Sequence, residues 1–219
     1  MHSYHLRDNL PALPPRMARL EIDHRGFPVP WFVAWIDGEP DFRVIDTPKI
    51  ARAVRERRCW VCGDVLGIYK VFLIGPMCAI NRVISEPPSH RDCAIFSAKA
   101  CPFLSQPRMR RNKKDLPVEY KKAAGFGIER NPGAVCVWIT KSFKPFSAHQ
   151  GSPGVLFRLG DPVECLWFAH GREATRFEVL ASIDEGYPQL EDLARQEGSV
   201  AMAALHRYRT ELMPLLPKQ

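Results

Sequence analysis

Four residues with the chemistry of metal ligands stand out in the middle of the sequence, as two pairs with the same internal spacing. Cys59 and Cys62 form a Cys-x-x-Cys pair that is followed by Gly63. Downstream, His90 and Cys93 form a His-x-x-Cys pair. Structural Zn²⁺ sites use four thiolate or imidazole ligands in a tetrahedron, and these spacings are typical of them. The sequence therefore predicts one structural Zn²⁺ ion bound by Cys59, Cys62, His90 and Cys93.

A zinc ion with four protein ligands has no coordination position left for water or substrate, so this site favours a role in folding over catalysis. Two alternatives stay open: a redox pair at Cys59 and Cys62, or thiols that are simply buried. Both leave the spacing of His90 and Cys93 unexplained. The chain has seven cysteines, an odd number that is unsuited to a disulfide framework. Cys78 and Cys101 are bracketed by apolar residues and are interpreted as buried thiols, with a role as substitute ligands or in a second site as the alternative.

Known catalytic motifs match poorly. A zinc deaminase needs His-x-Glu before its Cys-x-x-Cys, whereas here the Cys-x-x-Cys comes first. A treble-clef nuclease of the His-Asn-His type expects a general-base histidine between the two ligand pairs. No histidine lies between Cys62 and His90, and Asp23-His24 precedes the first pair instead. His149 and His170 are interpreted as exposed or hydrogen-bonded residues.

A strongly basic stretch follows the second ligand pair. Between positions 108 and 122 seven basic residues stand against only Asp115 and Glu119. The seven are Arg108, Arg110, Arg111, Lys113, Lys114, Lys121 and Lys122. Such a stretch either follows a nucleic-acid backbone or is a solvated loop, and stacking aromatics are few, with Tyr120 and Phe126 the candidates. Four arginines before the first ligand pair would enlarge the basic patch if they face the same side: Arg52, Arg55, Arg57 and Arg58.

The elements around the first ligand pair follow from local patterns. Aromatic and β-branched residues at 29–36 and 41–45 flank Asp-Gly-Glu-Pro, which predicts a β-hairpin. Thr47 followed by Pro48 predicts the start of a helix of about ten residues that leads to Cys59. A strand is expected at 68–74, and a helix capped by Ser89 is expected to end at Cys101, which places His90 and Cys93 in its first turn.

The second half shows strand patterns and then helix patterns. Strands are expected at 134–140, 154–159 and 164–169. Thr175 with Glu178 predicts the start of one helix, and Pro188 that of a second. The last helix is expected at about 200–213, and its apolar face most simply packs on the sheet. That face consists of Leu205, Tyr208, Leu212 and Leu216.

The composition of the chain indicates the general class of protein to which it belongs. The chain has 219 residues, of which 46% are hydrophobic, enough to form a packed core. Its 20 prolines disfavour long helical bundles, and its charge of +7 is compatible with phosphate backbones or acidic protein surfaces. No secretory leader and no membrane-spanning run is expected, so a cytoplasmic location is predicted and no membrane partner. Three regions are predicted: a zinc-bearing α+β half at 1–105, a basic connection at 106–133, and a β-rich half with C-terminal helices at 134–219.

Longer motifs surround the ligands: Cys-Trp-Val-Cys-Gly at 59–63, Ile-Gly-Pro-Met-Cys-Ala-Ile-Asn-Arg at 74–82, Glu-Pro-Pro-Ser-His-Arg-Asp-Cys-Ala at 86–94 and Ala-Cys-Pro-Phe-Leu at 100–104. This pattern resembles an uncharacterised family of bacterial and phage-borne zinc proteins, and the stretch from Cys59 to Cys101 resembles a treble clef. The resemblance implies a fold and brings no activity with it.

The predicted fold class is therefore α+β, with a treble-clef-like zinc module, a small, mainly antiparallel sheet and C-terminal helices. The predicted function is binding of nucleic acid or of a macromolecular partner through the basic surface. Two alternatives remain from other classes. One is a metal-dependent nuclease, and the other is a factor that binds and inhibits a host or phage enzyme.

Overall fold

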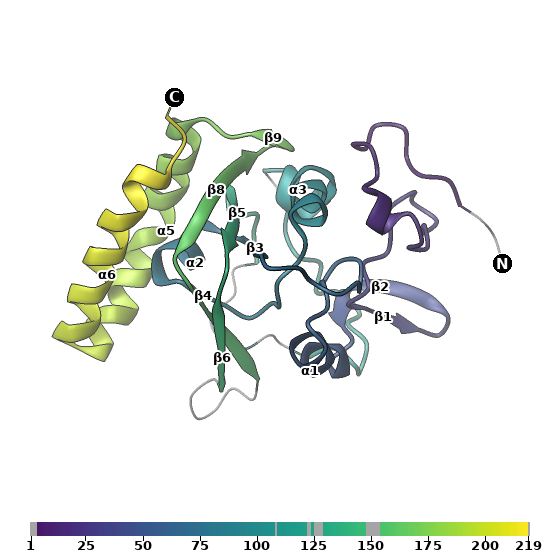
Figure 1. The fold of residues 1–219 in the computed structure, drawn as a ribbon, viewed down its shortest axis with the longest axis horizontal. Helices are drawn as coiled ribbons and strands as arrows, with labels where there is room; N and C mark the ends of the chain where they lie inside the picture. Colours follow the sequence, from purple (N-terminus) through teal and green to yellow (C-terminus); the bar gives the residue numbers. More distant parts are fainter. Residues whose placement is uncertain (1–3, 108, 122–123, 125–128, 148–153, 219) are drawn as a thin grey trace.

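The protein is an α+β fold in which short antiparallel sheets are covered by helices (Figure 1). A computed structural model describes residues 4–107, 109–121, 124, 129–147 and 154–218. Within these residues the strands form a two-stranded, a four-stranded and a three-stranded sheet. Among the described helices, none is both long enough and apolar enough to cross a membrane.

The predicted hairpin and the helix after it are confirmed. β1 (Val33–Ile36) and β2 (Glu39–Ile45) pair antiparallel around a two-residue loop, Asp37-Gly38. Both loop residues have positive φ, 49° and 84°, which is the backbone geometry that lets two twisted strands join through so short a loop. α1 (Pro48–Arg55) then begins with Pro48 in its first turn, where the missing N–H costs nothing.

The four-stranded sheet has the order β3-β5-β8-β9. Its strands are β3 (Lys70–Ile74), β5 (Val135–Thr140), β8 (Pro162–Ala169) and β9 (Arg172–Glu173). All six residues of β5 are buried, because both faces of this central strand are covered. Cys136 and Trp138 belong to the larger core, and Val137 on the opposite face belongs to a second core that also contains residues of the helix 91–100.

Two strands from the first half of the chain complete the sheets of the second half. β3 pairs with β5, and β4 (Val83–Ile84) pairs with β7 (Val155–Leu159). β6 (Phe143–Ser147), which the sequence did not predict, lies on the other side of β7. The basic segment at 106–133 therefore does not separate two sets of paired strands, because the pairing crosses it.

Short helical segments surround these sheets. They are the 3₁₀ helices Pro15–Met17 and Met213–Leu215, with α2 (Pro76–Asn81), α3 (Arg91–Ala100) and α4 (Pro102–Ser105). α3 is the helix expected to deliver the second ligand pair, but the predicted cap at Ser89 is wrong. Ser89 is held in an extended bridge, in which its N–H and C=O bond Val71, so α3 begins one residue later, with His90 at the N-cap.

The prediction that Pro188 starts a separate helix is also wrong. Pro188 lies inside α5 (Arg176–Glu197), which ends at Gly198 with φ 106° before α6 (Ser199–Leu212) begins. The predicted α6 is confirmed, and Leu205 and Leu212 are buried in the main core. Figure 1 shows α5 and α6 side by side along one flank of the molecule, and α6 packs on α5 and α2 rather than primarily on the sheet.

The start of α5 is fixed by a reciprocal cap, as the sequence predicted. Thr175 Oγ1 accepts the Glu178 N–H at 3.3 Å, and the Glu178 carboxylate accepts the Thr175 N–H at 2.8 Å. We expect Thr175→Ala to lower the free energy of unfolding by about 1 kcal/mol, the usual cost of losing an N-cap. Urea denaturation measures this change in the free energy of unfolding. Phe177→Ala is the matched control, because Phe177 is 80% exposed in the same turn, and equal stabilities of the two variants would contradict the expectation.

Candidate metal centre

The first ligand pair lies in a tight turn that is closed by backbone hydrogen bonds between its own residues. The Cys59 N–H donates to Asp64 O at 2.7 Å, and the Gly63 N–H donates to Cys59 O at 2.9 Å. Inside this turn the Cys62 N–H lies 3.4 Å from Cys59 Sγ, an amide donor aimed at a sulfur. Both thiols are buried, so the turn presents them together toward the interior.

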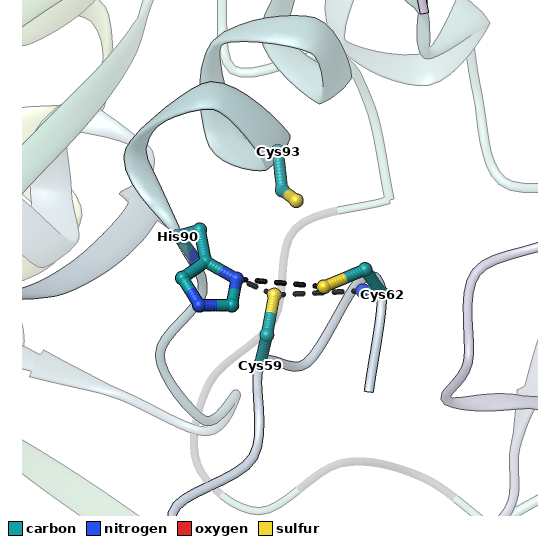
Figure 2. A group of neighbouring side chains, drawn as sticks. All are labelled: Cys59, Cys62, His90 and Cys93. Atoms are coloured by element: carbon teal, nitrogen blue, oxygen red, sulfur yellow. Dashed lines mark hydrogen bonds between the residues drawn. The ribbon is translucent and has the colours of Figure 1, made fainter. Parts of the chain in front are cut away.

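The second ligand pair is brought to the first by the start of α3. His90 is the N-cap of α3 and Cys93 lies in its first turn. The His90 N–H lies 3.3 Å from Cys59 Sγ, and His90 Nδ1 lies 3.4 Å from Cys62 Sγ. Figure 2 shows the four side chains converging, and their ligand atoms all lie within 4.8 Å of one another. The structure thus brings together the four predicted ligands, three of them buried and His90 half-buried.

The imidazole of His90 is oriented by a bond on its far side. Nε2 lies 3.1 Å from the carbonyl oxygen of Val65, which can only accept, so Nε2 carries the proton. Nδ1 therefore faces the thiols, and its lone pair becomes available to a metal ion when the ring is neutral. Metal-binding histidines commonly have such a carbonyl behind the ring, and it fixes both tautomer and orientation.

The electrostatics of the cluster fit a cation at its centre. Hydrogen bonds from the neighbouring groups Cys62 and Cys93 hold the pKa of Cys59 far below its usual range, and hydrogen bonds to Cys59 and Cys62 raise the pKa of His90 to about 10. Hydrogen bonds to Cys59 and Cys62 in turn raise the pKa of Cys93. A bound metal ion requires the remaining thiols to lose their protons, and its positive charge offsets the repulsion between the thiolates that form. The four residues are therefore a Cys₃His cluster that could hold a metal ion.

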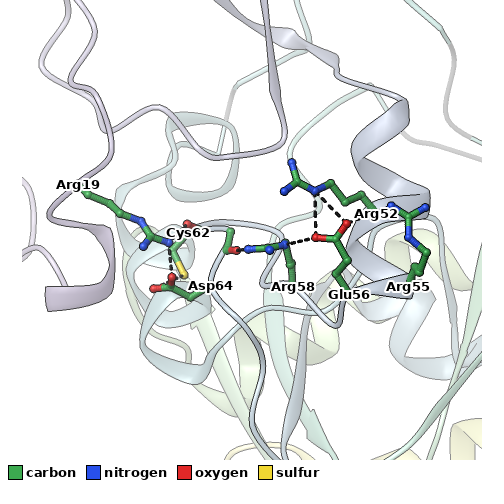
Figure 3. Close-up of polar contacts among 8 residues, drawn as sticks. Arg19, Arg52, Arg55, Glu56, Arg58, Cys62 and Asp64 are labelled. Atoms are coloured by element: carbon green, nitrogen blue, oxygen red, sulfur yellow. Dashed lines mark hydrogen bonds and ion pairs between the residues drawn. The ribbon is translucent and has the colours of Figure 1, made fainter.

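Residues outside the four ligands support the turn. Arg19, from the N-terminal segment, donates to Cys62 O at 3.1 Å and forms an ion pair with Asp64, whose carboxylate lies 3.9 Å from Cys62 Sγ (Figure 3). Met17 packs with the three cysteines in one apolar cluster. This contribution of residues 10–20 was not predicted, because no local pattern in the sequence connects them with a turn forty residues away.

The hairpin is attached to the same turn through aromatic rings. Trp60 stacks on Phe32, with centroids 5.0 Å apart and an interplanar angle of 12°, and meets Trp31 edge-on at 6.3 Å. The Trp31 N–H donates to Val61 O at 2.7 Å. Gly63 has φ 76°, and a Cβ built on it would lie 2.8 Å from the Trp31 ring. Glycine is thus required at this position both by the backbone and by the ring above it.

Comparison of the chain with protein-family models, with curated proteins and with solved structures finds no match in any of the three. The family resemblance noted from the sequence therefore stays a hypothesis, and the ligand cluster is the part of it that the structure shows. Function has to be argued from the site and the surface.

The other cysteines lie outside the cluster. In the part of the chain that the structure describes, no second group of three or more potential ligands is found. Burial raises the pKa of Cys78 to about 11 and raises that of Cys101 as well. Both are thiols at neutral pH, but they are partly buried, whereas the sequence predicted buried thiols.

Between the ligand pairs, the chain does not form a hairpin of its own, since β3 pairs with β5 and β4 with β7. Asp23 and His170 are not part of the metal cluster. Asp23 is buried and closes its own turn by accepting the N–H groups of Arg25 and Phe27 at 3.0 and 2.8 Å. His170 lies 3.5 Å from a Glu178 oxygen, and His149 is outside the described residues.

The basic residues fall on two stretches that border the hairpin. One follows β2 directly and carries Arg52, Arg55, Arg57 and Arg58. The other contains the exposed residues Arg110, Arg111, Lys113, Lys114 and Lys121, while Arg108, Lys122 and Phe126 lie outside the described residues. The Arg43 side chain on β2 donates to the Lys114 carbonyl at 2.7 Å and so ties the second stretch to the hairpin.

Proposed function

We propose that this protein binds the phosphate backbone of nucleic acid, and that a Zn²⁺ ion stabilises the turn beside the binding surface, in a centre whose ligand turn and helix, but not its hairpin, resemble those of a treble clef. Thiolate and imidazole ligands in a closed set of four favour Zn²⁺ over harder ions, and leave it no open position. In this proposal the metal ion maintains the fold and takes no part in a reaction.

The observation that carries the proposal is the excess of guanidinium groups around one carboxylate. Arg52 and Arg55 each pair with Glu56 at 3.0 Å, and Arg58 pairs with it at 2.6 Å (Figure 3). These bonds, with that from Arg58 the strongest, lower the pKa of Glu56 to about 2, so the carboxylate is ionised and still leaves the group with two net positive charges. Arg58 also donates to Gly63 O at 3.0 Å, which joins this arginine group to the metal-bearing turn.

The second basic stretch adds charge of the same sign beside the hairpin. Among the described residues Lys113 pairs with Glu129, whereas Arg110, Lys114 and Lys121 form no ion pair. The side-chain N–H donors of those three residues are available to phosphate oxygens. A polyanion that contacts both stretches would release counterions at each phosphate, which is the main source of sequence-independent affinity for nucleic acid.

Salt dependence tests the proposal. We expect labelled single-stranded DNA, duplex DNA and RNA to bind with an affinity that falls steeply as salt rises, followed by fluorescence anisotropy at several salt concentrations. The double variant Arg52→Ala/Arg55→Ala should reduce the slope of log K against log[salt] by about 2, because each arginine neutralises roughly one phosphate. Arg207→Ala/Arg209→Ala on α6 is the control of equal charge and should leave the slope unchanged.

Three results would decide against this proposal. Absence of binding to all three nucleic acids at low salt removes it. Strand cleavage that requires an added divalent metal ion indicates a nuclease instead. An equal reduction of the slope in the α6 control means that net charge, and not this surface, carries the affinity.

A further inference from the structure

A pocket of about 260 Å³ lies where α1, the start of β3 and the β5–β6 turn meet. Its apolar side includes Val54, Leu66 and Phe143. Its polar side consists of Arg57, Lys70, Lys141 and Ser142. None of the residues that line the pocket is acidic. Its three cations come from three separate parts of the chain.

The three cations have no acidic partner in the part of the chain that the structure describes. Among the described residues, none of Arg57, Lys70 and Lys141 forms an ion pair. Lys70 Nζ donates instead to the carbonyl oxygens of Gly67 at 2.5 Å and Ile68 at 2.9 Å, which hold it in place without neutralising it. Burial and, to a smaller extent, the nearby charge of Arg57 lower the pKa of Lys70.

Arg57 occupies a backbone position that normally takes glycine. Arg57 follows the C-cap of α1 and has φ 53°. Its carbonyl accepts the Leu66 N–H at 2.7 Å, and the Arg58 N–H donates to Ala53 O at 2.9 Å. Helices commonly end with glycine in this left-handed conformation, because a Cβ is strained there. Strain of this kind is concentrated at ligand-binding positions, where the side chain has a role that outweighs its cost.

We propose that this pocket binds a phosphomonoester group. A doubly charged phosphate matches the excess of positive charge, the fork of the guanidinium group suits two of its oxygens, and the Ser142 hydroxyl offers a further donor. The apolar side accommodates the organic part that carries the phosphate. The phosphate has two sources, a small free phosphomonoester or the terminal phosphate of a nucleic-acid chain, and this inference holds whether or not the backbone binding proposed above is correct.

Calorimetric titration of the intact, metal-loaded protein with inorganic phosphate at constant ionic strength tests the pocket. We expect one saturable site. Arg57→Gly and Lys141→Ala should each weaken it by about tenfold, the effect of removing one hydrogen bond between charged groups. Arg57→Gly is informative because glycine relieves the backbone strain, so its melting temperature should equal or exceed that of the wild type while its phosphate affinity falls.

Arg207→Ala is the matched control, since Arg207 is exposed on α6 and does not line the pocket, and the affinity of this variant for phosphate should be unchanged. Comparison of a 5′-phosphorylated oligonucleotide with its 5′-hydroxyl counterpart separates the two sources. Tighter binding of the first indicates a chain terminus, and equal binding alongside a saturable phosphate site indicates a small ligand. Absence of saturable phosphate binding, or equal affinity in the wild type, Arg57→Gly and Lys141→Ala, overturns the inference. Neither result bears on the salt-dependent binding measured with Arg52 and Arg55.

Discussion

Cys93→Ser will yield a protein that retains less than one metal ion per chain and has lost the ordered structure around α3. Cys93 lies in the first turn of α3 and its thiol is fully buried, so serine offers a weak ligand in a place that water does not reach. The free energy of binding a metal ion to such a site contributes directly to the free energy of folding, on the order of 10 kcal/mol for structural zinc. Cys62→Ser should behave in the same way.

Elemental analysis of freshly purified protein and hydrogen exchange across residues 59–100 measure this effect. Cys101→Ser is the matched control, because the Cys101 thiol lies outside the ligand cluster. That variant should retain one metal ion per chain and normal protection from exchange. A full equivalent of bound metal in Cys93→Ser, or its loss in Cys101→Ser, would show that the ligand set is wrong.

Gly63→Ala will weaken metal binding without removing a ligand. The position has φ 76°, a conformation that costs an L-residue about 1–2 kcal/mol. The added Cβ would also lie 2.8 Å from two atoms of the Trp31 ring, so that the ring has to move away from the turn. Because the turn must form before both cysteines reach the metal ion, we expect the metal affinity to fall by about tenfold or more.

Competition with a chromophoric chelator measures this affinity, and urea denaturation reports the accompanying loss of stability. Gly67→Ala is the control, because Gly67 has no positive φ and a Cβ there meets nothing within 4 Å. Its metal affinity and stability should match those of the wild type. An unchanged affinity in Gly63→Ala would mean that the turn tolerates the shifted ring and that Trp31 is not part of its support.

Local patterns in the sequence predicted the parts of the site that depend on neighbours in the chain. The spacing Cys-x-x-Cys and His-x-x-Cys identified the ligand set, because two ligands three residues apart reach one ion from a turn or from one helical face. Asp37-Gly38 identified the hairpin loop through its backbone preference, and Thr175 with Glu178 identified the start of α5. These features depend on short-range interactions between residues that are close together in the sequence.

The errors arose where short-range rules competed with contacts from elsewhere. Ser89 is a good N-cap by type, but its backbone is already bonded to Val71 in a bridge across the chain. Pro188 is a good first residue of a helix, yet α5 runs through it, and the close packing of Gly186 on Met77 belongs to that continuous helix. Proline removes one backbone donor there, and the buried residues of the helix on either side outweigh that loss.

By itself the sequence determined which four residues form the candidate metal site and which local turns present them, because those depend on side-chain chemistry and spacing along the chain. Only the tertiary structure decided that β3 and β4 pair with strands from the other half, and that Arg57, Lys70 and Lys141 meet at one pocket. The reason is physical. Pairing between distant segments is set by the burial of a whole core, to which each residue contributes a small share that no local pattern displays.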